Sequence, residues 1–246
     1  MPDTTDRPLV VSLEGNLLSG VSSIIKGLTD RHQSTYRIQA VYEPLKDIIH
    51  SRIGDIRWAQ HKDSLEGISA CVLEMSAFFR QRAQIDIRHN TDVIILDRSL
   101  SSLRHVFHLT SDMMMQRNTA DAVALHELHE SMEKFVPKPD MIVYVHAPIQ
   151  DLRSRIRMSR DHHISYQTLV DIDNLYNDFL AVYEADENSP TVVRVENANS
   201  KLASATYRTH AAISELFLFS KISEYSTTFS TCISYGDDHP TVLLDN

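Results

Sequence analysis

Short apolar runs rich in valine and isoleucine alternate along this chain with longer stretches of helical periodicity, and this alternation limits the possible folds. Each run is bounded by charged or turn-forming residues, which is typical of strands buried on both faces of a parallel sheet. The expected strands cover residues 9–13, 37–42, 92–97, 141–146 and 191–195. The alternation therefore predicts an α/β fold with a doubly wound, five-stranded parallel sheet flanked by helices.

The segments between the expected strands carry apolar residues at helical spacing. A first helix is expected over about 20–31, directly after the first strand. Three later stripes repeat every three or four residues, as expected for helix faces packed on a core. Their members are Leu65, Ile68, Val72, Met75 and Phe79; Leu125, Leu128, Met132 and Phe135; and Leu169, Ile172, Tyr176, Phe179 and Tyr183. The helix over 63–79 is also a candidate homodimer surface.

Composition favours one main domain and argues against several classes of protein. The chain has 246 residues, 42% of them apolar, and a formal net charge of −9, which disfavours a broad nucleic-acid surface. No apolar run is long enough to span a membrane, and the N-terminus is too polar for a signal peptide. Two distant cysteines favour a reducing compartment, so a cytoplasmic (intracellular) location is expected.

The domain is expected over 1–220, followed by a tail over 221–246 that is rich in serine, threonine and acidic residues. Three interpretations of this tail remain open. It is a late strand around 228–234, an interaction segment, or a disordered end.

The loop after the first expected strand has the spacing of a phosphate-binding loop. Gly15, Gly20 and Ser22 satisfy three of its four specified positions, but Val21 stands where the pattern requires lysine. Backbone N–H groups at a helix N-terminus bind phosphates, and a hydroxyl binds Mg²⁺, whereas valine cannot supply the ammonium group. On this stretch alone, an ordinary strand-to-helix turn is an equal alternative.

Polar residues also follow three other expected strands. Glu43 follows the second strand, and Asp97 and Arg98 end the third. A segment with four arginines follows the fourth, namely Arg153, Arg155, Arg157 and Arg160. Because ligands of doubly wound sheets bind at the carboxyl ends of the strands, these residues predict one shared site.

In order and approximate spacing, these segments resemble the deoxynucleoside kinase family. The matching segments are 13–16, 43–45, 97–99 with Ser102 and Phe107, 139–140 and 155–157, and the likeness covers about 8–197. The resemblance implies a fold of the P-loop kinase type. It also implies ATP and Mg²⁺ as cofactors, a small-molecule nucleoside or nucleotide as partner, and phosphorylation of a deoxynucleoside 5′-hydroxyl.

The resemblance implies a role for each matching residue. Glu43 would be the catalytic general base near the 5′-hydroxyl, with Arg98 beside it. Asp97, which stands where the family more often has glutamate, and Arg98 would bind the substrate, together with Glu66, which falls roughly where the family has a glutamine. Ser22 and Asp97 would bind the metal. ATP would be held by Gly15, Asn16, Ser19, Gly20, Ser22, Ser23, Arg155, Arg157 and Arg160, with the arginines approaching the phosphates when a lid closes.

Simpler interpretations of these residues stay open. Glu43 could be a solvated residue before a proline, and Asp97 with Arg98 could form a local salt bridge at a helix start. The arginines could form a solvated basic helix face.

Two departures from the family pattern fall on the phosphate site, because Leu18 replaces a loop glycine and Val21 replaces the lysine.

Because of these departures, three functions remain open. The first is a working deoxynucleoside kinase in which the lid arginines compensate for the absent lysine, with its activity impaired or not by Val21 and Leu18. The second is a catalytically inactive nucleotide- or nucleoside-binding relative that acts through a partner. The third is a nucleoside monophosphate kinase resembling thymidylate kinases, which Leu45 after Glu43 and Pro44 disfavours.

Overall fold

A computed structural model describes residues 7–30, 36–42, 91–102, 106, 138–158, 165–186, 189–199 and 201–234. The side chains of 223–234 are not among the described groups. Several sequence predictions therefore lie outside the described residues. These are Glu43, Glu66, Arg160 and the two apolar stripes within 65–79 and 125–135, including the candidate dimer surface.

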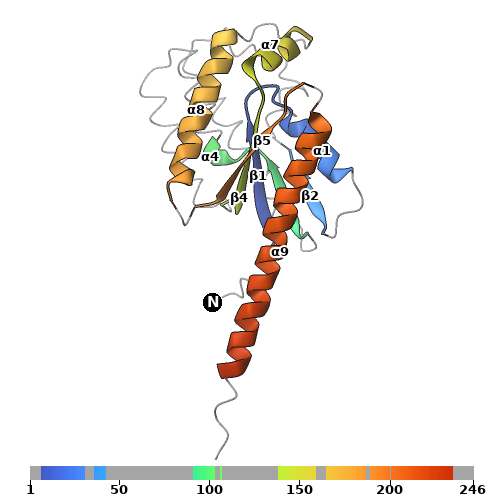
Figure 1. Ribbon diagram of the computed structural model, residues 1–246, viewed down its shortest axis with the longest axis vertical. Coiled ribbons are helices and arrows are strands. Elements are labelled where there is room, and N and C mark those ends of the chain that lie inside the picture. Colours follow the sequence, from blue (N-terminus) through green and yellow to red (C-terminus); the bar gives the residue numbers. More distant parts are fainter. Residues whose placement is uncertain are drawn as a thin grey trace, which may run out of the picture.

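The described strands form one parallel sheet of five strands, in the order β2-β3-β1-β4-β5 (Figure 1). Their bounds are β1 Leu9–Gly15, β2 Ile38–Val41, β3 Val93–Asp97, β4 Met141–His146 and β5 Thr191–Glu196. All five predicted strands are present, each shifted by no more than two residues. The prediction of a doubly wound parallel sheet is therefore confirmed, with β1 between β3 and β4.

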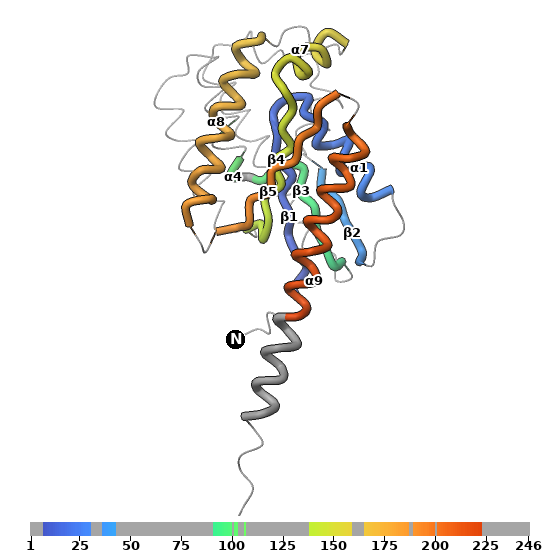
Figure 2. Tube along the Cα trace, viewed as in Figure 1, coloured from blue at the N-terminus to red at the C-terminus, as the bar shows by residue number. Residues whose placement is uncertain are grey.

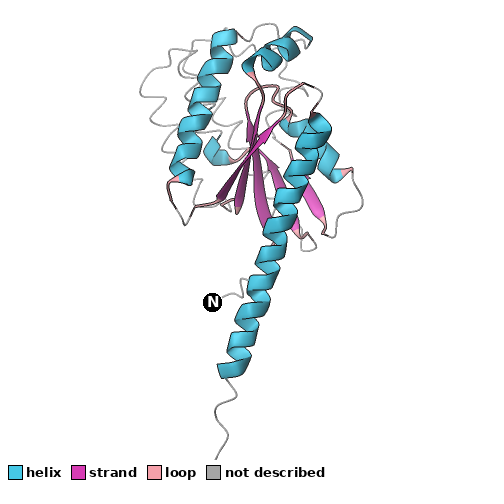
Figure 3. Ribbon diagram, in the orientation of Figure 1, coloured by secondary structure: helices cyan, strands magenta, loops and turns pink. Residues whose placement is uncertain are grey.

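Helices cover both faces of the sheet, as the ribbon coloured by secondary structure shows (Figure 3). Helices α1 (Val21–Thr29) and α9 (Leu202–Ser234) lie on one face, where they run side by side (Figure 2). Helix α8 (Tyr166–Glu184) covers the other face, and two shorter helices are α4 (Leu100–Ser102) and α7 (Ile149–Met158). This layering follows from strands that are apolar on both faces.

Two apolar clusters hold these layers together. On one face, Ile24 and Ile25 of α1 pack with Leu13 of β1 and Ile213 of α9. On the other face, α8 buries the stripe predicted from its spacing, in which Ile172, Tyr176 and Phe179 pack on β4 and Leu169 packs on α7. The periodicity of this stripe therefore identified a core face correctly.

Helix α9 continues as a single helix to Ser234 and projects well beyond the sheet (Figure 1). Of the three interpretations of the tail, the late strand around 228–234 is therefore wrong. Extending a helix that is already formed adds one hydrogen bond per residue, and this outweighs the β propensity of a short run of threonine, phenylalanine and isoleucine.

Within the described residues, no helix combines the length and the apolar character needed to cross a membrane.

Candidate phosphate-binding site

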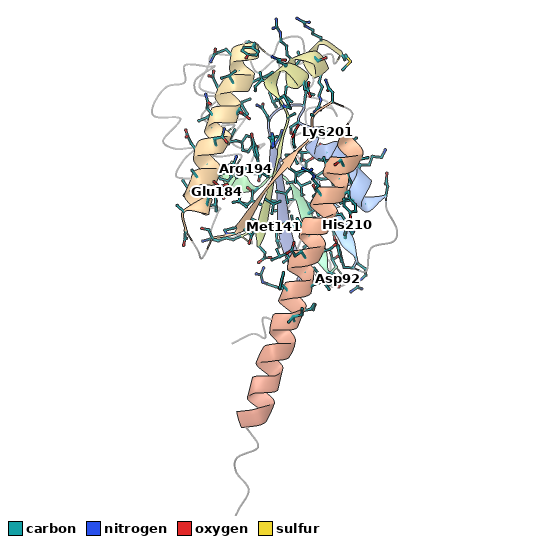
Figure 4. The ribbon with its side chains drawn as sticks, in the orientation of Figure 1. Asp92, Met141, Glu184, Arg194, Lys201 and His210 are labelled. Atoms are coloured by element: carbon teal, nitrogen blue, oxygen red, sulfur yellow. The ribbon has the colours of Figure 1, made fainter. Side chains whose placement is uncertain are left out.

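The candidate site lies at the carboxyl ends of the strands, where α7 and the loop between β1 and α1 meet (Figure 1). Figure 4 orients this end of the sheet: Lys201, which precedes α9, lies toward it, and Asp92, which precedes β3, lies at the opposite end of the sheet. We call residues 15–20 the phosphate loop. Because β1 is the central strand, this loop lies in the middle of the edge.

Both glycines of the phosphate loop are required by their surroundings. A Cβ atom at Gly15 would collide with Ser19 Oγ and would lie 2.6 Å from the carbonyl oxygen of Val145. Gly20 has a φ angle of 99°, and a Cβ atom there would collide with the side-chain amide of Asn197. The spacing in the sequence therefore identified two positions where the fold excludes a side chain.

Asn16 holds the loop rather than facing outward. Its Nδ2 donates to the carbonyl of Leu169 at 2.8 Å, and its Oδ1 accepts from the N–H of Leu17 at 2.8 Å. Its carbonyl also accepts from the N–H of Ser19 at 3.1 Å. Since Asn16 is 1% exposed, its side chain serves to attach the phosphate loop to α8.

Arg155 and Asn197 bind the carbonyl groups of the loop. Arg155 Nη1 lies 2.9 Å from the carbonyl oxygen of Leu18 and 3.2 Å from that of Ser19. Its Nη2 donates to the carbonyl of Asn197 at 2.6 Å, and Asn197 Nδ2 donates to the carbonyl of Ser19 at 2.7 Å. Burial among these groups lowers the pKa of Arg155 from its ordinary value.

The loop and the start of α1 also carry hydrogen-bond donors without a partner in the described part of the chain. Within the described part of the chain, the backbone N–H groups of Gly20 and Val21 have no acceptor. The hydroxyl of Ser19 is buried, and it also has no partner among these residues. Buried donors at the N-terminus of a helix suit a bound anion such as a phosphate group.

Ser22 and Asp97 meet beside the loop. The Ser22 hydroxyl, in the first turn of α1, donates to Asp97 Oδ2 at the end of β3 over 2.8 Å. Asp97 is 2% exposed. Magnesium sites commonly use one or two protein oxygens and complete their coordination with phosphates and water. The pair predicted from the sequence as metal ligands therefore does come together in space.

Val21 packs into the core instead of facing a ligand. It is 4% exposed, and one of its methyl groups lies 3.0 Å from where a Cβ atom of Gly15 would be. Leu18, the second departure, has a φ angle of 61°, in the left-handed region that favours glycine. The loop thus keeps its glycine-like backbone while lacking the ammonium group of a lysine.

Glu14 forms a buried hydrogen-bond network that the sequence did not lead us to predict. Its Oε1 accepts from the N–H of Ser99 at 2.8 Å and also from the hydroxyl of Ser12. The Tyr176 hydroxyl donates to Oε2 at 3.4 Å. Complete burial raises the pKa of Glu14 above its ordinary value. A signal was available, since Ser12 and Glu14 are polar residues at alternate positions of an otherwise apolar strand.

Arg98 connects the ends of two neighbouring strands. Its N–H donates to the carbonyl of Leu13, and its Nη2 donates to the carbonyl of Gly15 at 3.3 Å. Its φ angle of 69° is unusual for a residue with a side chain.

Two other predicted ligands, Ser23 and Arg157, are exposed on α1 and α7.

The structure thus brings together most of the described candidates, which are Gly15, Asn16, Ser19, Gly20, Ser22, Asp97, Arg98 and Arg155. It adds Asn197, which the sequence reasoning missed because it considered only the ends of the first four strands. Asn197 directly follows β5, so the same rule about strand ends would have found it.

Comparisons with known proteins agree with this geometry. Residues 11–216 match the model of the deoxynucleoside kinase family. A deoxyadenosine kinase from M. mycoides, solved with the products dCMP and a flexible dCDP, superposes with a TM-score of 0.62 and 14% identity, covering 84% of this chain and 100% of that one. A thymidylate kinase from Candida albicans superposes with a TM-score of 0.59 and 16% identity, covering 85% and 92%.

At these identities the two structures show a shared fold alone, and the comparison with curated proteins gives no match. The family model, however, covers most of the chain, and its range contains the phosphate loop, Asp97, Arg155 and Asn197. This chain therefore belongs to the deoxynucleoside kinase family.

Proposed function

We propose that this protein transfers a phosphate group from ATP to the 5′-hydroxyl of a deoxynucleoside, at a rate reduced by Val21 and Leu18. The observation that carries the proposal is the hydrogen bond between Ser22 and Asp97, beside a loop with open N–H donors. A hydroxyl, a carboxylate and a helix N-terminus are the groups that P-loop kinases use to hold Mg²⁺ and phosphates.

The described residues fit ATP and Mg²⁺. The N–H groups of Gly20 and Val21 and the hydroxyl of Ser19 would donate to phosphate oxygens, since all three are open within the described chain. Ser22 and Asp97 would hold Mg²⁺, which would neutralise phosphate charge in the absence of the lysine. Arg157, exposed on α7, and Arg160 would approach the phosphates on lid closure.

The acceptor side of the reaction is assigned to Glu43, Glu66 and Arg98. Glu43 would take the proton of the 5′-hydroxyl as general base, and Glu66 would contact the nucleoside. Arg98 reaches the carbonyl of Gly15, at the first residue of the loop. This contact supports a place for Arg98 between the donor phosphate and the nucleoside.

One observation favours a second function, namely nucleotide or nucleoside binding without transfer. Val21 is packed in the core, so the lysine position carries no charge, and Arg155 is engaged with loop carbonyls. Removing one well-placed electrostatic donor from an active site typically costs about a hundredfold to a thousandfold in rate. Such a loss could leave binding as the remaining activity.

The test measures phosphate transfer from ATP to a panel of deoxynucleosides and deoxynucleoside monophosphates. The variants are Val21→Lys and Glu43→Gln, with Glu184→Gln as the matched control on the exposed surface of α8. We expect slow transfer to a deoxynucleoside by the parent, transfer about a hundredfold faster by Val21→Lys, and none by Glu43→Gln. The control is expected to match the parent.

Other results would decide for the alternatives. ATP binding without transfer, by both the parent and Val21→Lys, would identify a binding protein. Transfer to monophosphates alone would identify a monophosphate kinase.

A further inference from the structure

Two residues from different elements hold the same carbonyl group of the phosphate loop. Arg155 of α7 and Asn197, which directly follows β5, both donate to the carbonyl of Ser19, and Arg155 also binds that of Leu18. Arg155 further donates to the carbonyl of Asn197, so the two residues are joined to each other. We call Arg155 and Asn197 the carbonyl clamp.

The clamp is itself held by backbone contacts of the sheet edge. The N–H of Asn197 donates to the carbonyl of His146 at 2.8 Å, which continues the pairing of β5 with β4. Asp151 of α7 accepts from both the N–H and the side-chain amide of Asn199, at 2.7 and 3.0 Å. These bonds fix α7 against the segment after β5, and with it the position of the clamp.

Holding a carbonyl also fixes the direction of the next N–H group. In a trans peptide, the carbonyl of one residue and the N–H of the next point in opposite directions, and the described chain has no cis peptide. With the Ser19 carbonyl directed at the clamp, the Gly20 N–H points to the opposite side of the loop. On that side it has no acceptor within the described residues.

The clamp also acts on Leu18, one of the two loop residues that depart from the family pattern. Leu18 adopts a left-handed backbone conformation, with a φ angle of 61°, that costs energy for any residue with a Cβ atom. Its carbonyl accepts the 2.9 Å bond from Arg155. A charged donor on this carbonyl opposes the relaxation of Leu18 to an ordinary conformation.

We propose that Arg155 and Asn197 are positioning residues that keep the phosphate loop in its phosphate-binding shape, and that they compensate for leucine in place of glycine at position 18. The phosphate ligand in this inference rests on the proposed function. The effect of the clamp on the loop backbone does not, so the two can be tested separately.

The first measurement is the mobility of the Gly20 amide, followed by NMR relaxation in the protein without ligand. We expect a rigid Gly20 amide in the parent and a mobile one in Arg155→Ala and in Asn197→Asp, which replaces the donating amide by a carboxylate of the same shape. Arg153→Ala is the matched control, because Arg153 is exposed on the same helix and lies over the ring of Tyr166. A Gly20 amide as rigid in the two clamp variants as in the control would overturn the proposal.

The second measurement is the affinity for ATP by calorimetry, together with the free energy of unfolding. We expect each clamp variant to weaken ATP binding by about tenfold or more, beyond any effect of Arg153→Ala. Unchanged binding in Asn197→Asp beside weakened binding in Arg155→Ala would show that Arg155 contacts phosphate directly, and would overturn the clamp.

A third variant tests the compensation for Leu18. Glycine adopts the left-handed conformation without penalty, so Arg155→Ala is expected to weaken ATP binding less in a Leu18→Gly background. An equal loss in both backgrounds would refute the compensation. If the parent binds no ATP, the proposed function fails, while Gly20 mobility in these same variants still decides whether the clamp exists.

Discussion

At the scale of single residues, Leu18 and Val21 alter the phosphate loop in two different ways. Leu18 changes the cost of the backbone shape, because its φ angle of 61° lies where glycine is favoured. Val21 changes the charge, because a side chain packed in the core occupies the sequence position at which the family pattern has a lysine. The first change is opposed by bonds to the loop carbonyls, whereas no such bond can restore a missing charge.

Glu14 carries a prediction about pH at the same scale. Burial raises its pKa above the ordinary 4.5, so the folded protein retains a proton that the unfolded chain releases. The contribution of Glu14 to stability is therefore fully present below 4.5 and is lost as the pH rises toward the folded-state value. Glu14→Gln, which resembles the protonated form, is expected to gain stability relative to the parent as the pH rises above 4.5.

Urea unfolding of the parent and of Glu14→Gln, repeated at pH values from below 4.5 upward, measures the difference in their free energies of unfolding. Glu215→Gln on the exposed face of α9 is the control. A difference between the parent and Glu14→Gln that stays constant with pH would show that Glu14 does not titrate differently in the folded state.

At the scale of elements, α9 stabilises the fold through its first half. Ile213 is fully buried and packs in the same cluster as Ile24 and Leu28 of α1. Tyr36, which precedes β2, adds a ring contact to Phe217 and a 2.9 Å hydrogen bond to Ser214. The packing of α9 on α1 thus covers one face of the sheet.

Ile213→Ala is expected to lower the free energy of unfolding by about 2–5 kcal/mol, since it removes a buried side chain and leaves a cavity. Chemical denaturation measures the loss. Leu218→Ala is the matched control on the same helix, because Leu218 is 60% exposed. Equal effects of the two substitutions would contradict the packing described for α9.

The ion pair between α8 and β5 contributes much less to stability than the buried side chain of Ile213. Arg194 lies 3.0 Å from Glu184, and both side chains are about two-fifths exposed (Figure 4). Exposed pairs of this kind contribute little, typically 0 to about 1 kcal/mol. This is why Glu184→Gln can serve as a control in the activity test.

At the scale of the whole molecule, strand order assembles the site. Central β1 supplies the phosphate loop, β3 supplies Asp97, and Asn197 follows β5 at the sheet edge. Residues far apart in the chain therefore meet at one edge. A ligand bound there would contact several elements at once and would stabilise the folded state against the unfolded one.

We expect ATP with Mg²⁺ to raise the unfolding temperature of the parent, with a larger rise than ATP gives without the metal. Asp97→Asn is expected to remove most of the difference due to Mg²⁺, because it removes the negative charge of a proposed metal ligand. Asp178→Asn on the exposed face of α8 is the control. An undiminished Mg²⁺ effect in Asp97→Asn would refute the metal role of Asp97. The measurement is a thermal unfolding curve at fixed ligand concentration.

Local patterns in the sequence predicted a large part of this fold. Short apolar runs identified all five strands, and helical spacing identified the core face of α8. The late strand at 228–234 failed because β propensity is a local preference, and a helix already packed on α1 extends through it. Glu43 and Glu66 remain predictions.

The sequence by itself determined the α/β class and the two loop glycines, because spacing and residue chemistry are local. The pairing of the Ser22 hydroxyl with the Asp97 carboxylate joins positions far apart in the chain, and only the family resemblance implied it. Only the tertiary structure decided which groups hold the loop. Arg155 and Asn197 reach the carbonyl of Ser19 from elements far away in the chain. Contacts of this kind depend on strand order and helix packing, so neither residue type nor spacing could assign Arg155 to carbonyl groups.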